Sequence, residues 1–246
     1  MDYAVSEQSY ESARMRADWT VYALGAGIIT SMARIVISVV EVRQYSGLAA
    51  TIPLKEADKT DKAMLLESAI ILGSLAVWLT TMVLFLMWFH RVCSNLKPLG
   101  ARRLQHTARL AVAVWFIPFA HLFIPHRIAK EVWIKSDTSR ETNDFLYKGS
   151  SVPGFINAWW GCWVASCLIG YGSSQLSAKA SIVADRRLAD WFSVISEALS
   201  IAAAILAIRV IRSITARQEE SSQRIRGIGQ PPPPPVFDSG QGASVQ

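Results

Sequence analysis

The chain lacks several features that would point to a soluble or secreted protein. It has only 3 cysteines in 246 residues, and the spacing of Cys162 and Cys167 matches no standard pair of metal ligands. The first 18 residues contain four acidic side chains and no apolar core, so a cleaved secretory signal is not expected. The sequence has no internal repeat, and its apolar runs do not alternate with polar residues, which argues against strands. These absences favour an all-α protein that depends on neither disulfide bonds nor a bound metal.

Long apolar runs are what the chain has instead. Hydrophobic residues make up 51% of it, and the mean hydropathy is +0.26. Four runs, at residues 19–42, 69–89, 155–176 and 191–211, reach the length of about 20 residues that a helix needs to cross a bilayer. The third does so only when residues 173–176 are included. We therefore expect an integral membrane helical bundle with four transmembrane helices.

A further apolar segment, residues 106–135, does not fit a simple span. Only the 15 residues 110–124 are uncharged, and the segment contains Pro118 and Pro125. Each proline lacks a backbone donor and disfavours helical geometry in the residue before it. The stretch that follows, HRIAKEVWIK, has the basic amphipathic pattern of a helix lying in the headgroup region. The favoured interpretation is a proline-broken segment that enters and leaves at one face; the alternative is a kinked fifth transmembrane helix.

The distribution of Lys and Arg favours the re-entrant arrangement. When Arg209 is counted with the tail, four crossings place 17 of these residues on one side of the membrane and 7 on the other, whereas five crossings place 14 against 10. Short cytoplasmic loops carry an excess of Lys and Arg. We therefore expect both termini in the cytoplasm. The lead covers residues 1–18, and the tail, residues 212–246, contains PPPPP and is expected to be disordered.

Three stretches of the sequence carry a family resemblance. The first, WFHRVCSNLKPLG, fits W-x-x-R-x-x-x-N-x-x-x-L-G through Trp88, Arg91, Asn95, Leu99 and Gly100. The second, WFIPFAHLFIPHRIAKEVW, fits W-F-x-P, P-x-R and E-x-W through Trp115, Pro118, Pro125, Arg127, Glu131 and Trp133. The third, GFINAWWGCW, carries Trp159, Trp160 and Trp163.

Over roughly residues 19–211 the chain resembles the bacterial membrane family catalogued as domain of unknown function 4328. It differs at His121 and His126, where that family often has Asn and Tyr. The resemblance implies an integral protein of a bacterial inner membrane, and the family brings no established activity.

Charged residues give the remaining candidates. Arg34 and Glu197 fall inside predicted spans, where charge is costly, so they indicate an internal ion pair or a pathway. The alternative is that Arg34 extends to the nearer interface. A basic surface suited to anionic lipid headgroups is expected from Arg91, Arg102, Arg103, Arg127 and Lys130. No nucleic-acid recognition motif accompanies this charge, so nucleic acid is not an expected partner.

No catalytic constellation is evident in the sequence, and the spacing of the four histidines matches no haem or metal motif. We therefore expect neither enzymatic activity nor a cofactor. The favoured function is a non-catalytic scaffold, regulator or lipid-sensing protein at the cytoplasmic membrane face, with anionic lipid as a partner and a protein partner for the proline-rich tail. The alternative is a small-solute or ion transporter or channel that uses the broken segment and Arg34.

Overall fold

The computed structural model describes residues 9–54, 61–137 and 152–228. Within these residues, six α-helices form the fold. Four are long: α1 (Arg14–Ser46), α2 (Asp61–Ser94), α5 (Gly154–Lys179) and α6 (Val183–Ile228). Two are short, α3 (Ala108–Ala113) and α4 (Ile124–Lys135), and the 3-10 turns η2 (Val114–Phe116) and η3 (Ala120–Leu122) lie between them. The expectation of an all-α protein is confirmed.

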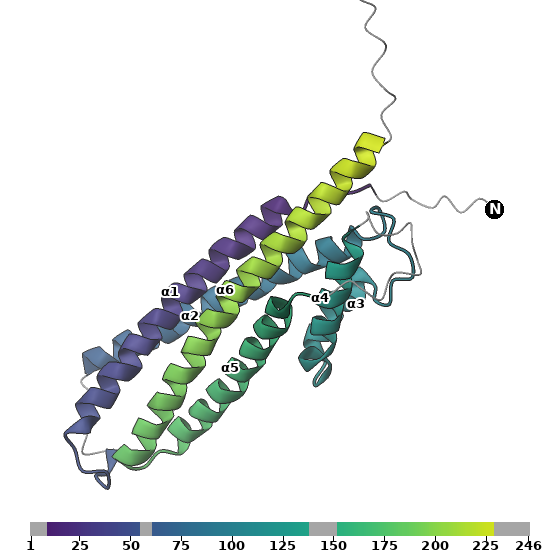
Figure 1. The fold of residues 1–246 in the computed structure, drawn as a ribbon. Helices are drawn as coiled ribbons and strands as arrows, with labels where there is room; N and C mark the ends of the chain where they lie inside the picture. Colours follow the sequence, from purple (N-terminus) through teal and green to yellow (C-terminus); the bar gives the residue numbers. More distant parts are fainter. Residues whose placement is uncertain (1–8, 55–60, 138–151, 229–246) are drawn as a thin grey trace, which may run out of the picture.

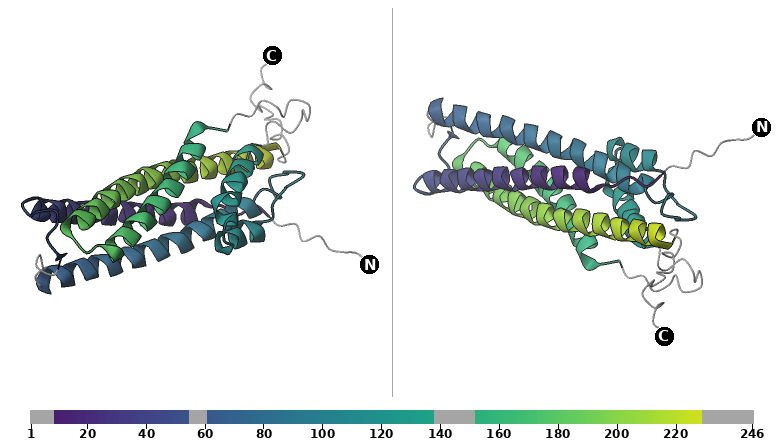
Figure 2. Two further views of the ribbon diagram at one scale, coloured as in Figure 1. Left: turned by 90° about the horizontal axis from the view of Figure 1, so that it is seen from below. Right: turned by 90° about the horizontal axis from the view of Figure 1, so that it is seen from above.

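The four long helices form an elongated bundle in which neighbours along the chain run in opposite directions (Figure 1). Helix α6 packs against α5 and α1, and α1 packs against α2. At one end, which we call the connection end, the segment after α1 meets the segment before α6: Leu54 N–H donates to the Ser181 carbonyl (3.1 Å) and Val183 N–H to that of Ile52 (3.1 Å). At the other end, the hairpin end, α3 packs against α2 and α4 packs against α5. Both views of Figure 2 show the short helices at this end of the bundle.

Three helices are long and apolar enough to cross a membrane: Arg14–Ser46, Ser68–Ser94 and Val183–Gly227. In the first of these helices, only 6% of the most apolar 18-residue stretch is buried within the protein. Such exposure of apolar side chains is typical of a helix that faces lipid. Helix α5 has 26 residues, enough at about 1.5 Å each to cross a core of about 30 Å, but its Gly, Ser and Asn residues make it less apolar. The described residues therefore contain three candidate spans and a fourth long helix packed among them.

The best-buried side chains gather at the hairpin end. They come from the C-terminal half of α2, from α4, from the start of α5 and from α6, and include Trp88, Phe89, Val92, Ile128, Val132, Ile156, Ile211 and Ile214. This core ties the two short helices to the bundle. The hairpin end is thus a packed protein interior, whereas the middle of the bundle presents apolar side chains outward.

Helix α6 extends well into the predicted tail. Disorder is expected from residue 212, but the helix continues to Ile228. Ile214 and Gln218 are completely buried, and Ser221 is buried as well. Tertiary contacts keep this polar stretch helical, and the hydropathy of the sequence does not predict such contacts. This corrects the expected start of the tail, and residues 229–246, with the proline run, lie outside the described residues.

Candidate functional site: a hairpin docked at the end of the bundle

Residues 102–137, which we call the hairpin, leave the bundle and return to the same place. The Glu131 carboxylate, in α4, accepts a hydrogen bond from the backbone N–H of Gln105 (2.6 Å). The Lys135 ammonium group donates to the carbonyl oxygen of Arg102 (3.0 Å). The two arms are therefore joined at their base, and the segment does not run the length of the bundle.

The tip of the hairpin is a break at Pro118. Ile117, just before it, is extended (φ −96°, ψ 119°), as a residue preceding proline prefers, and Phe119, just after it, has a φ of 63°. This left-handed conformation is strained for a bulky residue and has to be held by its surroundings. The indole N–H of Trp160 donates to the carbonyl of Leu122 (2.9 Å), which lies in the broken part of the segment. An acceptor freed by the break is thereby satisfied by α5.

An aromatic cluster, formed by Phe85, Trp115, Trp159, Trp160 and Trp163, anchors the hairpin against α2 and α5. The ring of Trp115 meets Phe85, Trp160 and Trp163 edge to face, with centroids 5.4, 5.9 and 5.6 Å away. Phe85 also lies 6.0 Å from Trp159. Such pairs contribute about 0.5–1.5 kcal/mol each beyond the burial of their area. The tryptophans of the third motif thus pack against one another, and Trp160 and Trp163 pack against Trp115 of the hairpin.

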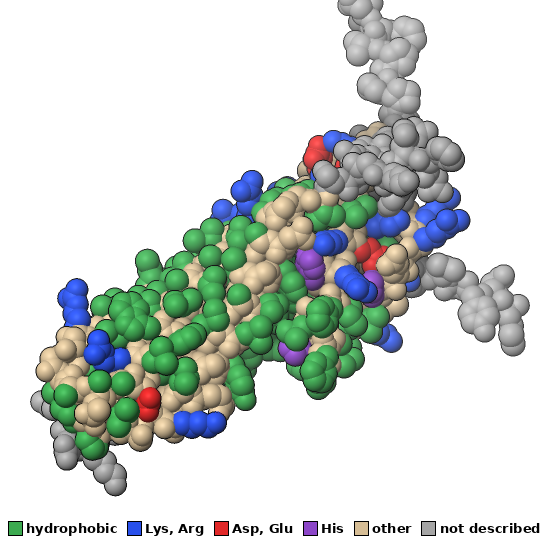
Figure 3. Space-filling view, turned by 60° about the horizontal axis from the view of Figure 1, so that its bottom comes forward, with side chains coloured by type: hydrophobic (Ala, Val, Ile, Leu, Met, Phe, Trp, Pro, Cys, Tyr) green, Lys and Arg blue, Asp and Glu red, His purple; other side chains and the backbone are tan. Residues whose placement is uncertain are grey.

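The exposed surface of the hairpin is apolar at its tip and basic towards its base. The exposed apolar side chains at the tip are Phe116 (66%), Ile117 (48%), Phe119 (79%) and Phe123 (63%). Arg102, Arg103 and Arg127 are exposed, and Lys130 is half-buried. In Figure 3, Lys and Arg side chains gather at the hairpin end of the bundle. An apolar tip can enter the acyl region of a bilayer while the basic side chains towards the base contact anionic headgroups.

Two histidines lie in the hairpin at contrasting sites. Nδ1 of His106 is 2.6 Å from the Glu131 carboxylate at the base of the hairpin. The ring of His126 stacks on Trp160 at 5.8 Å, and its Nε2–H donates to Asn157 (3.0 Å). Burial, with the nearby Lys130 charge, lowers the pKa of His126, although the bond to Asn157 opposes the shift. Docking therefore favours the neutral ring at His126.

The first motif joins the end of α2 to distant parts of the chain. Trp88 donates its indole N–H to Thr215 of α6 (3.1 Å). The Arg91 guanidinium pairs with the Glu11 carboxylate (2.5 Å), and the Asn95 amide donates to the Glu11 carbonyl (2.8 Å). These residues do not reach an open surface together. Their roles in the structure are to position α2, α6 and the N-terminal segment.

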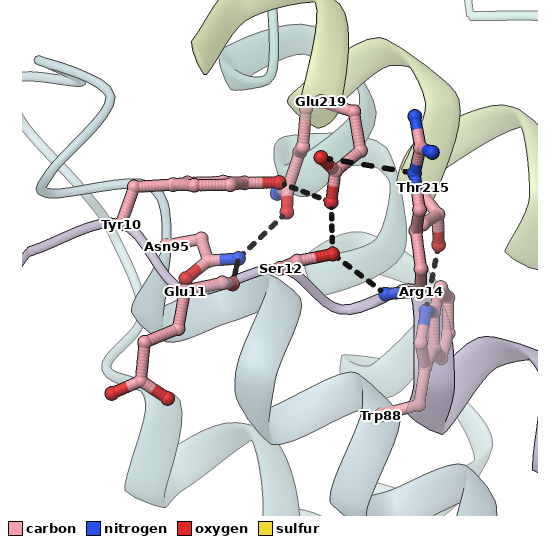
Figure 4. Close-up of polar contacts among 9 residues, drawn as sticks. Tyr10, Glu11, Ser12, Arg14, Trp88, Asn95, Thr215 and Glu219 are labelled. Atoms are coloured by element: carbon pink, nitrogen blue, oxygen red, sulfur yellow. Dashed lines mark hydrogen bonds and ion pairs between the residues drawn. The ribbon is translucent and has the colours of Figure 1, made fainter. Parts of the chain in front are cut away.

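The N-terminal segment completes this clasp at α6. Tyr10 and Ser12 both donate hydrogen bonds to the Glu219 carboxylate, and Arg14 lies 3.8 Å from it (Figure 4). Burial, together with the bond to Glu219, raises the pKa of Tyr10. We call residues 10–14, with Asn95, Gln218 and Glu219, the N-terminal clasp. The sequence shows no sign of it, because its hydrogen bonds join residues that lie 84 or more positions apart.

Other motif residues set the path of the backbone and seat α4. Gly100 has a φ of 86°, a conformation that glycine adopts without steric cost, where the chain turns from α2 towards the hairpin. Pro125 is buried in the first turn of α4. Trp133 packs edge-on against Phe155 (5.7 Å), and the Arg217 guanidinium lies 4.2 Å from its ring centroid. The second motif therefore builds and seats the hairpin.

Arg34 and Glu197 are brought together, as one of the two interpretations of the sequence requires. Nε of Arg34 lies 2.5 Å from the Glu197 carboxylate, joining α1 to α6. This pair and the hairpin do not share a site: within the described residues, the cavity beside Arg34 is lined by α1, α2, α5 and α6. A function that uses both features at one place is therefore not supported by the geometry.

Metal binding finds no support in the part of the chain that the structure describes. It contains no group of three or more His, Cys, Asp or Glu side chains placed to hold an ion. The cysteines in it, Cys93, Cys162 and Cys167, are free thiols.

Comparison with known proteins gives a family and nothing further. The family model described as "Domain of unknown function (DUF4328)" matches residues 53–216. This interval contains α2, the hairpin, α5 and most of α6. No curated protein and no solved structure matches the chain.

Proposed function

The chain belongs to the DUF4328 family, and from that premise we propose that it is a non-catalytic protein of the bacterial inner membrane that senses anionic lipid through the hairpin. The observation that carries the proposal is the closed base of the hairpin, where Lys135 bonds to the Arg102 carbonyl at 3.0 Å. With its base closed and its tip apolar and exposed, the hairpin is suited to enter one leaflet without crossing the bilayer.

The depth of the tip agrees with this arrangement. Leu122 is bonded to Trp160, which lies 6 residues after the start of α5 at Gly154, or about 9 Å along the helix. Insertion of about 5–10 Å brings an apolar surface to the boundary between headgroups and acyl chains. Phe119 then reaches acyl chains while Arg127, later in the hairpin, stays near headgroup phosphates.

The same proposal includes the topology. Four transmembrane helices, α1, α2, α5 and α6, with the hairpin on the cytoplasmic side, are supported by the excess of Lys and Arg in the segments at the hairpin end. Both termini then lie in the cytoplasm. The proline-rich run beyond residue 228 is proposed as a docking segment for a protein partner.

Lipid selectivity tests the proposal. The protein is reconstituted in phosphatidylcholine, and the association of spin-labelled phosphatidylglycerol is compared with that of spin-labelled phosphatidylcholine by electron paramagnetic resonance. Each basic residue near a membrane surface contributes about 1 kcal/mol to anionic lipid attraction. Replacing Arg102, Arg103, Arg127 and Lys130 with Gln is expected to lower the selectivity for phosphatidylglycerol several-fold, to near one.

A matched variant removes charge from the other end of the bundle. Arg43→Gln with Lys179→Gln alters exposed cations near the connection end and is expected to leave the selectivity of the native protein nearly unchanged. An equal loss per charge removed in the two variants would attribute the selectivity to net charge and overturn a specific role for the hairpin. A native protein without selectivity would overturn lipid sensing itself.

A further inference from the structure

A second, separate site lies in the half of the bundle near the connection end. A cavity of about 580 Å³ opens there between α1, α2, α5 and α6. Small-molecule sites occupy roughly 300–1,000 Å³, so this volume suits an organic molecule and exceeds what a bare metal ion requires. Among the described residues that line the cavity, none belongs to the hairpin.

Polar side chains line three of the cavity walls at helical spacing. On α1, Arg34 and Ser38 are four residues apart, and on α6 the same spacing separates Ser193 from Glu197. Residues at this spacing share one face of a helix. Helix α5 contributes serines to the lining, among them Ser174. Three helices thus turn polar faces towards one space, which suits a ligand that forms hydrogen bonds.

The pair of Arg34 and Glu197 lies deep in the bundle. Arg34 precedes the end of α1 by 12 residues, or about 18 Å of helix, and Glu197 follows the start of α6 by 14 residues, or about 21 Å. Both of these helix ends lie at the connection end. At the level of the pair α5 and α6 approach closely, because a Cβ on Gly170 would meet Ser196 Oγ at 2.8 Å. The pair therefore lies where close helix packing narrows the cavity.

The pair is electrically neutral, but it leaves hydrogen-bonding capacity unused. Its hydrogen bond joins Nε of Arg34 to one carboxylate oxygen of Glu197, 2.5 Å away. No other group of the described residues hydrogen-bonds to either side chain. A guanidinium has five N–H donors and a carboxylate has about four acceptor sites. Donors of Arg34 and acceptors of Glu197 are therefore available side by side to a molecule in the cavity.

Compensated charge selects against ions at this site. A further ion beside a neutral pair would leave a net charge away from bulk water, which is costly. Nearer the connection end, Arg186 contacts Glu41 (2.9 Å) and Asp190 (3.2 Å), so the charges there are also held in ion pairs. An uncharged molecule with both an acceptor and a donor adds hydrogen bonds without adding charge.

We infer that this cavity binds a small uncharged carboxamide carried on a short apolar skeleton. A primary amide presents an acceptor and donors on one planar group: its carbonyl oxygen accepts from Arg34, and its N–H donates to Glu197. The carbon skeleton packs against Ile37, Ile70 and Ile71, which line the same cavity. The site does not depend on the lipid role of the hairpin, because it lies nearer the other end of the bundle.

Binding is measured on the full-length protein in nanodiscs, as the concentration dependence of its thermal unfolding midpoint. The probe is butyramide, and n-butylammonium and butyrate are its charged counterparts, compared at matched ionic strength. Saturable stabilisation by butyramide and none by either ion is the expected result. Equal effects of the three compounds would assign binding to the carbon chain alone and overturn the inference. No effect of butyramide would leave only water in the cavity and overturn it as well.

Two charge variants are expected to change which compound binds. Glu197→Gln leaves Arg34 without its counter-ion, so butyramide binding is expected to weaken about tenfold or more, and butyrate is expected to bind. Arg34→Gln leaves Glu197 alone, so n-butylammonium is expected to bind in place of butyramide. The matched control, Glu220→Gln, breaks the exposed pair with Arg224 at the hairpin end and is expected to change nothing. Loss of butyramide binding in both variants without a gain of the complementary ion would assign the pair to the fold alone and overturn the inference.

A variant that changes no charge keeps the test decisive if the charge variants do not fold. Ser174→Phe places a ring in the cavity lining and is expected to abolish butyramide binding. Gln175→Phe, at the neighbouring exposed position outside the lining, is expected to bind as the native protein does. Retained binding in Ser174→Phe would locate the probe elsewhere and overturn the assignment. The lipid selectivity of the hairpin is expected to stay unchanged in these variants, which separates the two proposals.

Discussion

At the scale of single residues, Gln218 shows how polar side chains hold the hairpin end together. It is completely buried in α6, and its amide donates to the Val92 carbonyl (2.9 Å) and to the Ser136 hydroxyl (3.1 Å). It also accepts from the Asn95 amide at 3.4 Å. One side chain therefore connects α6 to the end of α2 and the end of α4. Burial of a polar group is tolerated here because its donors and acceptor are used.

Replacement of Gln218 by Ala is expected to destabilise the protein by about 1–3 kcal/mol, because partners at Asn95 and Ser136 lose their hydrogen bonds in a buried site. The thermal unfolding midpoint in detergent micelles measures the effect. Gln223→Ala makes the same chemical change at an exposed position of the same helix and is expected to shift the midpoint little. Similar shifts in the two variants would contradict the role given to Gln218.

At the scale of elements, the hairpin is held at two levels. Glu131 and Lys135 close its base, and the aromatic cluster, together with the hydrogen bond from Trp160 to Leu122, holds its tip. The segment does not cross the bundle as one regular α-helix, because Pro118 and Pro125 divide it into pieces too short to span a bilayer. The length of each piece and its contacts make the hairpin an element distinct from the four long helices.

The docking of the hairpin tip is expected to weaken as the pH falls from 7 to 5. Docking lowers the pKa of His126, so the undocked state takes up the proton first as the pH drops through the ordinary value of about 6.5. The contribution of the neutral His126 ring to docking is therefore fully present above that pH and is lost progressively below it. A bimane label on Phe123→Cys, in a chain whose native cysteines are replaced, reports docking through quenching by Trp160.

His126→Asn keeps a polar side chain near Asn157 but removes the titration, so its quenching is expected to change less with pH. His121→Asn, at a half-buried position near the tip, serves as the matched control and is expected to keep the native profile. A pH profile in His126→Asn identical to that of the native protein would exclude this residue as the cause.

At the scale of the whole molecule, the two ends of the bundle have different characters. The hairpin end is a packed core with a clasp of distant residues, and the connection end carries the charge-lined cavity. Apolar side chains cover much of the bundle between them (Figure 3). In the proposed topology, this distribution places the hairpin end on one side of the membrane and the connection end on the other.

Cysteine accessibility to a membrane-impermeant maleimide tests that placement. Gln105→Cys and Gly154→Cys, on either side of the hairpin, are expected to react only after the membrane is permeabilised. Ala49→Cys, at the connection end, is expected to react in intact cells. Reaction of Gln105→Cys and Gly154→Cys from opposite sides would establish five spans and refute the re-entrant arrangement.

Local patterns in the sequence carry much of the architecture. The apolar runs predict the long helices because crossing a bilayer demands about 20 apolar residues in succession. Pro118 predicts the break because it cannot donate a backbone hydrogen bond. The cost of charge in hydrocarbon predicts that Arg34 needs a partner, and Glu197 is that partner in the structure.

The tertiary structure alone decides what holds these helices in register. The helical extension of α6 beyond residue 212, the N-terminal clasp and the Gln218 network depend on hydrogen bonds between residues far apart in sequence. The cavity likewise depends on four helices meeting, and in the sequence the polar residues that α1, α5 and α6 contribute to it are only scattered serines and charges. Hydropathy and local geometry are properties of short stretches of chain, whereas the satisfaction of a buried polar group is a property of the assembled fold.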